Sequence, residues 1–208
     1  MALLERNVLC LEGEWEYKNS IFNDNASVKH VLQTLDNLEE NFSFYHRRVG
    51  TISELERYLK EFFSDRRQHK SFTVINFAFH GSPGVIDLGE SAQQEKQVIP
   101  LLKDNTEEES AKSLIELLPN INDLNNRIIY FGSCKTFKDA RTLKEFKRIS
   151  GAKAVIGYSE DVDFIESSAA ELLLFQKLLY YKRPGDAKNS LKSTIPGLYE
   201  RLGIQFIT

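Results

Sequence analysis

Short apolar runs alternate along the chain with segments whose apolar residues have helical spacing. The runs are apolar on both faces, as in strands of a sheet covered on both sides; they are Asn7–Leu11, Phe42–His46, Thr73–Phe79, Arg127–Phe131 and Ala152–Gly157. The helical segments between and after them are Val28–Glu40, Ile52–Phe63, Glu107–Leu118, Asp139–Ile149 and Glu166–Tyr181. This alternation predicts an α/β fold: a three-layer α/β/α sandwich with a mostly parallel central sheet.

Two of the predicted helices carry a start signal. Thr51 with Glu54, and Thr106 with Glu109, fit the S/T-x-x-E capping box, in which each side chain accepts a hydrogen bond from the other residue's backbone N–H. We therefore expect helices to begin close to residues 51 and 106.

Two regions are less regular. From Gly81 to about Asn105 the sequence predicts a loop, a short hairpin around Gly84–Leu88 and a polar excursion. From Lys182 onward it predicts a turn at Arg183–Gly185, a short helix and a terminal apolar segment that packs back onto the body. No Pro/Gly/Ser-rich linker divides the chain, so we expect a single domain over residues 1–208.

Composition narrows the function classes. The 208 residues are 41% hydrophobic and 27% charged, which is ordinary for a globular protein. With 27 Lys and Arg against 30 Asp and Glu, the formal net charge is −3, so no general attraction to nucleic acid or to an anionic membrane is expected. We expect neither a signal peptide nor a membrane span, and the 2 cysteines are compatible with a reducing cytoplasm.

The candidate chemistry lies where two predicted strands end. Thr73–Phe79 runs directly into His80, and Arg127–Phe131 runs directly into Gly132-Ser133-Cys134. Ligands of open parallel sheets bind at the carboxyl ends of the strands. If these two strands are parallel neighbours, the imidazole and the thiol emerge at the same edge of the sheet.

A converging cysteine and histidine are the minimum for catalysis by a thiol nucleophile, because the imidazole takes the thiol proton or stabilises the thiolate. The glycines Gly81 and Gly132 would let a substrate approach the backbone, where the N–H groups of Gly81 and Cys134 would bind an oxyanion. The alternative is that Cys134 is a small core residue and His80 a hydrogen-bonded structural one.

Three sequence blocks carry a resemblance to a known family. NFAFHGSPG followed by IIYFGSCKT resembles the two signature blocks of the caspase-like cysteine peptidases, the clan of caspases, separase, gingipains and bacterial CHAT domains. A third block, AKAVIGYSEDVDFIESSAAELLL, is similar to the strand, loop and helix that follow the catalytic cysteine in separase and in CHAT domains. The caspase pattern Q-A-C-[RQG]-G is absent, because Gly132-Ser133-Cys134-Lys135-Thr136 stands in its place.

The resemblance implies a role for each matching residue. His80 would be the catalytic histidine, Cys134 the nucleophile, and the Gly81 N–H part of the oxyanion hole. Asp161 and Asp163 lie in the loop that resembles the separase pocket and would bind a basic substrate side chain. The alternative for these two is an acidic cluster that complements the dipole of the following helix.

These observations predict a cysteine endopeptidase that cleaves proteins or peptides after a basic residue, with no cofactor. If the enzyme is regulated, we expect a protein partner, a ligand or a dimer to order the loop Gly81–Asn105. Two alternatives stay open. One is a catalytically silent caspase-like module used for binding or as a scaffold. The other is a different thiol hydrolase, such as an amidase or glutaminase, although the G-x-S/C-x-G elbow of such enzymes lacks its second glycine here.

The other histidines and the basic pairs predict no separate site. His30 and His69 stand among polar, charged residues, and His46 has no second ligand at metal spacing. The pairs Arg47-Arg48 and Arg66-Arg67 are short and flanked by acids, which is typical of solvated faces. No zinc, EF-hand, P-loop or dinucleotide motif occurs in the sequence.

Overall fold

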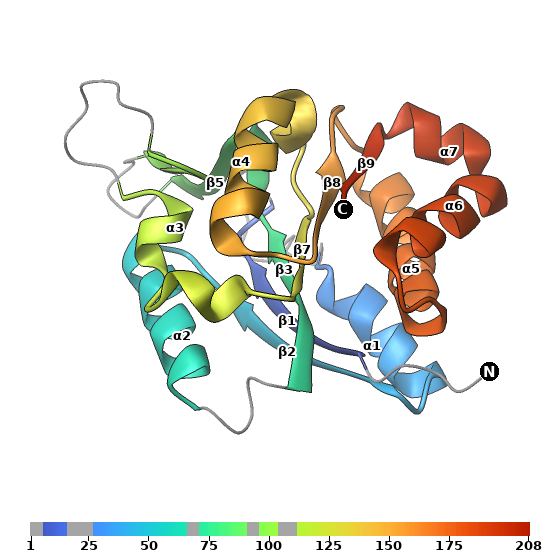
Figure 1. Ribbon diagram of the computed structural model, residues 1–208, viewed down its shortest axis with the longest axis horizontal. Coiled ribbons are helices and arrows are strands. Elements are labelled where there is room, and N and C mark those ends of the chain that lie inside the picture. The colour runs from blue at the N-terminus through green and yellow to red at the C-terminus, as the bar shows by residue number, and fades with distance from the viewer. Residues whose placement is uncertain (1–5, 16–26, 66–70, 91–95, 104–111) are drawn as a thin grey trace.

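A computed structural model describes residues 6–15, 27–65, 71–90, 96–103 and 112–208 of the chain. At its centre is a six-stranded sheet in the order β2-β1-β3-β7-β8-β9 (Figure 1). Neighbouring strands are parallel except for β9, which runs antiparallel to β8. The strands are β1 (Arg6–Glu12), β2 (Phe42–Arg48), β3 (Phe72–Ala78), β7 (Ile128–Phe131), β8 (Ala154–Tyr158) and β9 (Ile204–Ile207).

The five predicted strands all occur in a mostly parallel sheet, as expected. Four of them are buried, whereas β2 is an edge strand and only partly buried. The terminal apolar segment packs back as expected, in the form of the edge strand β9. Successive side chains of each strand point to opposite faces, so the doubly apolar runs fill two hydrophobic clusters at once. On β1, for example, Leu9 and Leu11 belong to one cluster and Val8 and Cys10 to the other.

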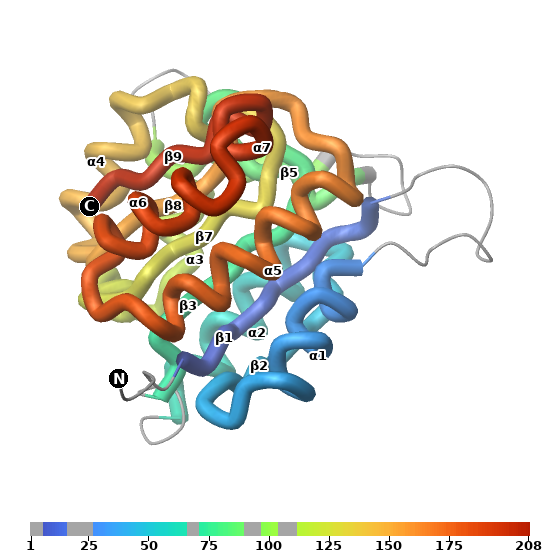
Figure 2. Tube along the Cα trace, turned by 90° about the vertical axis from the view of Figure 1, so that its right-hand side faces the viewer, coloured from blue at the N-terminus to red at the C-terminus, as the bar shows by residue number. Residues whose placement is uncertain are grey.

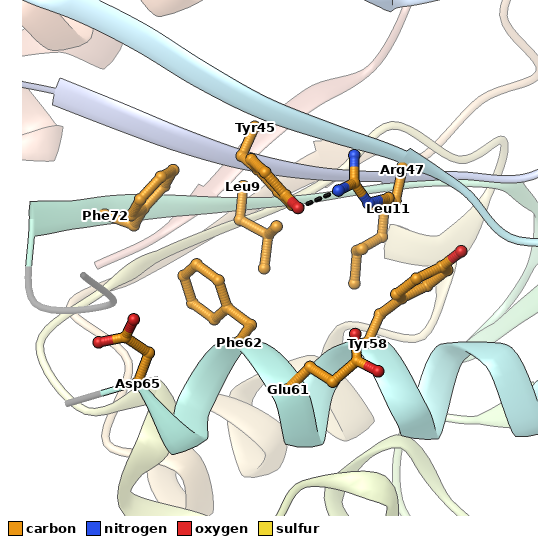
Figure 3. A pocket seen from close by; sticks show the side chains of 9 residues that line it. All are labelled: Leu9, Leu11, Tyr45, Arg47, Tyr58, Glu61, Phe62, Asp65 and Phe72. Atoms are coloured by element: carbon orange, nitrogen blue, oxygen red, sulfur yellow. Dashed lines mark hydrogen bonds between the residues drawn. The ribbon is translucent and has the colours of Figure 1, made fainter. Parts of the chain in front are cut away.

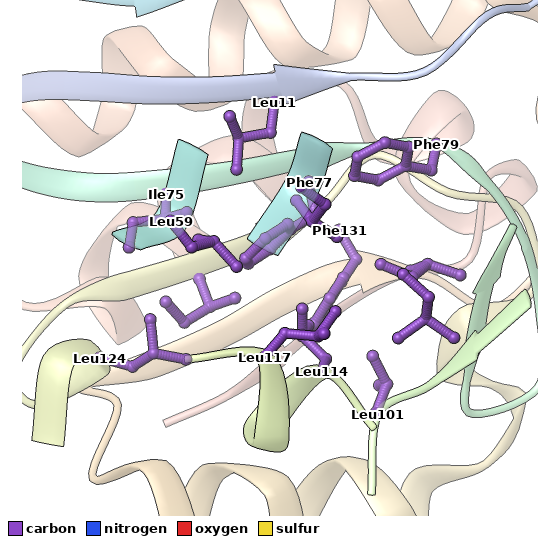
Figure 4. Packing of buried hydrophobic residues seen from close by; sticks show 14 of the residues in the cluster. Leu11, Leu59, Ile75, Phe77, Phe79, Leu101, Leu114, Leu117, Leu124 and Phe131 are labelled. Atoms are coloured by element: carbon purple, nitrogen blue, oxygen red, sulfur yellow. The ribbon is translucent and has the colours of Figure 1, made fainter. Parts of the chain in front are cut away.

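One face of the sheet is covered by three helices, α2 (Ile52–Ser64), α3 (Leu114–Leu117) and α4 (Ala140–Ser150) (Figure 1). Figure 4 shows how their leucines meet the phenylalanines of the sheet, with Leu59 of α2 and Leu114 of α3 directed toward Phe77 and Phe131. A second, antiparallel sheet joins this cluster; its strands are β4 (His80–Ser82), β5 (Val85–Glu90) and β6 (Lys96–Pro100). The side chains of Ile86 and Ile99 bury it against the core.

The opposite face is covered by four helices, α1 (Lys29–Leu38), α5 (Phe164–Tyr180), α6 (Pro184–Thr194) and α7 (Pro196–Arg201) (Figures 1 and 2). Helix α5 is the longest and lies between α1 and the pair α6 and α7 in Figure 2. The sheet is therefore sandwiched between two helical layers, as the alternating pattern predicts.

Two local predictions are wrong. Of the helix expected over Glu107–Leu118, only Leu114–Leu117 is helical among the described residues, and the expected start at Thr106 lies outside them. The observed capping box is formed by Ser113 and Glu116. Pro119 ends the helix early, because it disfavours helical backbone at the residue before it, and Leu118 is extended.

The second wrong prediction is the turn at Arg183–Gly185. Pro184 instead begins α6, a position where its missing N–H and fixed φ suit a helix. The predicted hairpin around Gly84–Leu88 is confirmed: β4 and β5 are joined by a turn with Gly84 at φ +69°. The third strand, β6, and the short 3-10 helices η2 (Ile121–Leu124) and η3 (Thr136–Lys138) complete the described elements.

Candidate functional site

His80 and Cys134 lie at the carboxyl edge of the central sheet. Strands β3 and β7 are parallel neighbours with Phe77 opposite Phe131, and each of the two residues lies three positions beyond its strand partner. Both side chains are half-buried and line the same cavity of ≈ 210 Å³. The prediction that the imidazole and the thiol emerge at one edge is therefore confirmed.

Gly81 holds the two segments in close contact. A Cβ added to Gly81 would lie 2.6 Å from the carbonyl oxygen of Cys134 and 2.7 Å from the Cβ of Ser133. Carbon atoms do not approach backbone oxygen so closely, so only glycine allows β4 to pack against the turn that carries Cys134. Gly81 itself lies opposite Ile86 in β4 and does not line the cavity, whereas Gly132 does.

The backbone around Cys134 fixes the position of its sulfur. Lys135 follows in the left-handed region, with φ 56°, and its N–H donates to the carbonyl of Glu160 at 3.0 Å. This turn brings Sγ of Cys134 to 3.5 Å from the backbone N–H of Val162, which donates to it. The thiol in turn donates to the carbonyl oxygen of Val162 at 3.9 Å, so the sulfur is held against the backbone of this residue.

Trp15 covers His80 from the end of β1. The two rings meet edge to face with centroids 5.4 Å apart, and both line the cavity. The indole N–H of Trp15 donates to Oε1 of Glu12 at 2.6 Å. Trp15 is the single tryptophan of the chain. It was not predicted as a site residue, because it stands three residues beyond the end of β1 and not directly after the strand.

Glu12 is the fully buried anchor of this arrangement. Besides Trp15 it receives hydrogen bonds from Ser27 at 2.7 Å and from the N–H of Val28 at 2.8 Å, and its other partner is His46 at 2.6 Å. Burial by itself raises the pKa of Glu12, but these hydrogen bonds outweigh it and hold the pKa below the usual range. His46, left without a role by the sequence, therefore supports the wall of the cavity.

A second buried carboxyl, Glu171 of α5, lines the cavity itself. The hydroxyl of Tyr130 donates to its Oε1 at 2.8 Å, and the hydroxyls of Tyr130 and Tyr158 lie 2.7 Å apart. Burial raises the pKa of Glu171 to about 7, and the negative charge of Glu12 adds to the rise, while the tyrosine hydrogen bonds oppose it. The sequence holds a signal for this residue: it is a lone acid on the apolar stripe that continues with Leu174, Phe175 and Leu178.

The two acids expected to bind substrate do not line the cavity. Asp161 is exposed and forms an ion pair with Lys135. Asp163 is the N-cap of α5, and its Oδ1 accepts from the N–H of Ile165 at 2.8 Å and of Glu166 at 3.1 Å. The structure thus places Asp163 in the helix-capping role that was the alternative, and the cavity wall in this loop comes from its apolar residues Val162 and Phe164.

A second cavity, of ≈ 170 Å³, opens between α2 and the edge strand β2 (Figure 3). Tyr45 and Arg47 of β2 cover it from above, and Glu61, Phe62 and Asp65 come from α2 and the residue after it. Neither Cys134 nor His80 lines it, so it is separate from the candidate site.

The described residues contain no group of three or more His, Cys, Asp or Glu side chains that could hold a metal ion. None of their helices is long and apolar enough to cross a lipid bilayer.

The fold and the site together define the class: a three-layer α/β protein with a cysteine and a histidine at the carboxyl ends of adjacent parallel strands. The chain belongs to a family described as "Family of unknown function (DUF6642)", whose profile matches residues 5–186. No curated protein matches the chain in sequence.

Among solved structures, the chain is similar to Raptor from Chaetomium thermophilum, with 12% sequence identity and a TM-score of 0.46. The match covers 90% of this chain and 20% of that one, so the chain spans about a fifth of the length of that protein. A likeness at this level says nothing about function.

Proposed function

We propose that the protein is a cysteine endopeptidase in which Cys134 is the nucleophile and His80 the general acid and base. The observation that carries the proposal is that both side chains line one cavity, at the carboxyl ends of adjacent parallel strands. The close packing of Gly81 on the Cys134 turn supports it, because this packing fixes the two segments relative to one another. The resemblance of the two strand blocks to caspase-like peptidases adds a reason to choose peptide bonds as the substrate.

The proposed reaction has two stages. The Cys134 thiolate attacks a peptide carbonyl carbon and forms an S–C bond; the C–N bond then breaks as protonated His80 gives its proton to the leaving amine. Neutral His80 next takes a proton from water, whose oxygen attacks the thioester carbon. The S–C bond then breaks, which releases the acid and restores the Cys134 thiolate beside protonated His80. The N–H of Cys134, which lines the cavity, is proposed to bind the oxyanion in both stages, together with the N–H of Gly81, a residue outside the cavity lining.

We test this proposal with peptidyl acyloxymethyl ketones that carry Arg, Lys, Asn or Asp next to the reactive group. An active Cys134 displaces the acyloxy group and forms a stable thioether, which mass spectrometry of the digested protein locates. We expect the adduct on Cys134 and none on Cys10, which is fully buried. His80→Gln is expected to slow labelling by about 100-fold or more, because proton transfer by a positioned side chain contributes at least that much.

The matched control is Cys10→Ala, which removes the other thiol and should label at the wild-type rate. Absence of an adduct on Cys134 with every probe would reject the peptidase. In that case the silent binding or scaffold module becomes the better interpretation.

The remaining parts of the proposal concern the surroundings of the reaction. The substrate is a protein or peptide cut after Lys or Arg, and no cofactor takes part. The two cysteines are free thiols, which agrees with the cytoplasm as the compartment we propose. A regulatory partner is proposed to act on the segment Gly81–Asn105. The described part of this segment is packed on the core, because Ile86 and Ile99 are buried. Residues 91–95 and 104–105 lie outside the described residues.

A further inference from the structure

Two oxygen atoms that accept hydrogen bonds lie buried beside the catalytic cavity without a donor. Within the part of the chain that the structure describes, neither Oε2 of Glu171 nor Oδ1 of Asn76 has a hydrogen-bond partner. Buried acceptors are almost always paired, because an unpaired one loses its hydrogen bonds to water and gains nothing. Two such atoms near one cavity therefore point to a ligand that supplies donors.

Gly132, a cavity-lining residue without a side chain, lies close to the two side chains that carry these acceptors. A Cβ built on Gly132 would lie 3.3 Å from Oε1 of Glu171 and 3.5 Å from Oδ1 of Asn76. The backbone at Gly132 therefore packs closely against Glu171 and Asn76, with little room for a side chain. Glu171, Gly132 and Cys134 line the same cavity, so the buried carboxyl belongs to the cavity of the nucleophile.

The rest of the cavity fits a cationic group on an apolar stem. Trp15, Val162 and Phe164 line it with apolar surface, against which the methylene groups of Lys or Arg would pack. Among the described lining residues, His80 is the only one with a basic side chain. A buried carboxyl in such a cavity selects a cation with N–H donors over a neutral group.

We propose that Glu171 is the specificity residue, which binds the guanidinium or ammonium group of the substrate side chain beside the scissile bond. This inference rests on the proposed peptidase function and replaces the acidic loop as the origin of the basic preference. The carboxylate accepts from the cation through Oε2, while Tyr130 continues to donate to Oε1. Oδ1 of Asn76, which is also close to Gly132, is a neutral acceptor nearby.

The test measures binding without catalysis, in the full chain with Cys134→Ala at pH 8. N-acetyl-arginine N-methylamide is titrated against its citrulline analogue, which has nearly the same shape and no charge; Trp15 fluorescence and calorimetry report binding. We expect the arginine ligand to bind about 10- to 100-fold more tightly, as for a buried hydrogen bond to a charged group. Adding Glu171→Gln should make the two affinities equal.

Glu166→Gln is the matched control, because it makes the same change on the same helix at a residue paired with Arg201. It should keep the full preference. If Glu171→Gln does not fold, Tyr130→Phe gives a second measure: loss of its hydrogen bond to the carboxylate should weaken the arginine ligand several-fold and leave the citrulline ligand unchanged.

Equal binding of the two ligands, or binding of neither, would overturn the assignment of Glu171. The assignment would also be overturned if Asp161→Asn lost the preference for the arginine ligand while Glu171→Gln kept it. The proposed function fails separately: arginine preference without any labelling of Cys134 rejects the peptidase, and labelling without arginine preference rejects only the role of Glu171.

Discussion

At the scale of single residues, the two buried carboxyls differ in what surrounds them. Glu12 has four hydrogen-bond partners and a lowered pKa, which is the environment of a structural anchor. Glu171 lines the cavity and has a pKa raised to about 7 by burial, although tyrosine hydrogen bonds oppose the rise, and this is the environment that we propose serves a ligand. Both side chains are buried, so the opposite directions of their pKa shifts come from their different hydrogen-bond partners.

The raised pKa of Glu171 makes a prediction about stability. The unfolded chain ionises this carboxyl near 4.5 and the folded chain near 7, so the unfolded state binds fewer protons between these values and stability falls as pH rises. The stability of the wild type relative to Glu171→Gln should fall by about 3 kcal/mol across this window and then level off. Urea unfolding of both proteins from pH 4.5 to 8 measures it. A difference that does not vary with pH would show that the folded carboxyl ionises normally.

At the scale of elements, the site depends on how closely β4 packs on the turn that contains Cys134. We expect Gly81→Ala to separate the two segments, because its Cβ would lie 2.6 Å from a backbone oxygen that cannot move like a side chain. Labelling of Cys134 by an arginyl acyloxymethyl ketone should fall at least about 10-fold, since small misplacements of catalytic groups are costly. Gly197→Ala is the control, because no atom lies within 4 Å of its added Cβ. Wild-type labelling in Gly81→Ala would show that this contact does not position the site.

The elements also show which features the sequence could predict. The strands that end at His80 and Cys134 are apolar on both faces, so their burial, their pairing and the meeting of the two residues could be inferred. The limits of the helix predicted over Glu107–Leu118 could not be inferred from its apolar spacing. Among the described residues the helix begins after the cap Ser113 and ends before Pro119. Glu171 was missed because α5 brings it to the cavity from outside both catalytic blocks, and Asp161 and Asp163 were favoured only for their place in a similar loop.

At the scale of the whole molecule, the site lies at one edge of a sheet that is buried on both faces. The layer of α2, α3 and α4 packs under Phe77 and Phe131, and the layer of α1 and α5 to α7 packs against Tyr130 and Tyr158. Strands β3 and β7, which lead to His80 and Cys134, are therefore held from both sides (Figure 1). Glu171 comes from the second layer, so the proposed site joins the sheet edge to that layer.

The central claim is that this fold makes Cys134 a reactive thiol, and the rates of alkylation of the two cysteines test it most directly. Cys10 is an internal reference, because burial raises its pKa well above the usual value. The protein is treated with iodoacetamide from pH 5.5 to 9, and mass spectrometry follows each cysteine. We expect Cys134 to react well below pH 8 and faster than Cys10, with the advantage lost in His80→Gln. Equally slow reaction of both thiols, unchanged by His80→Gln, would contradict the account.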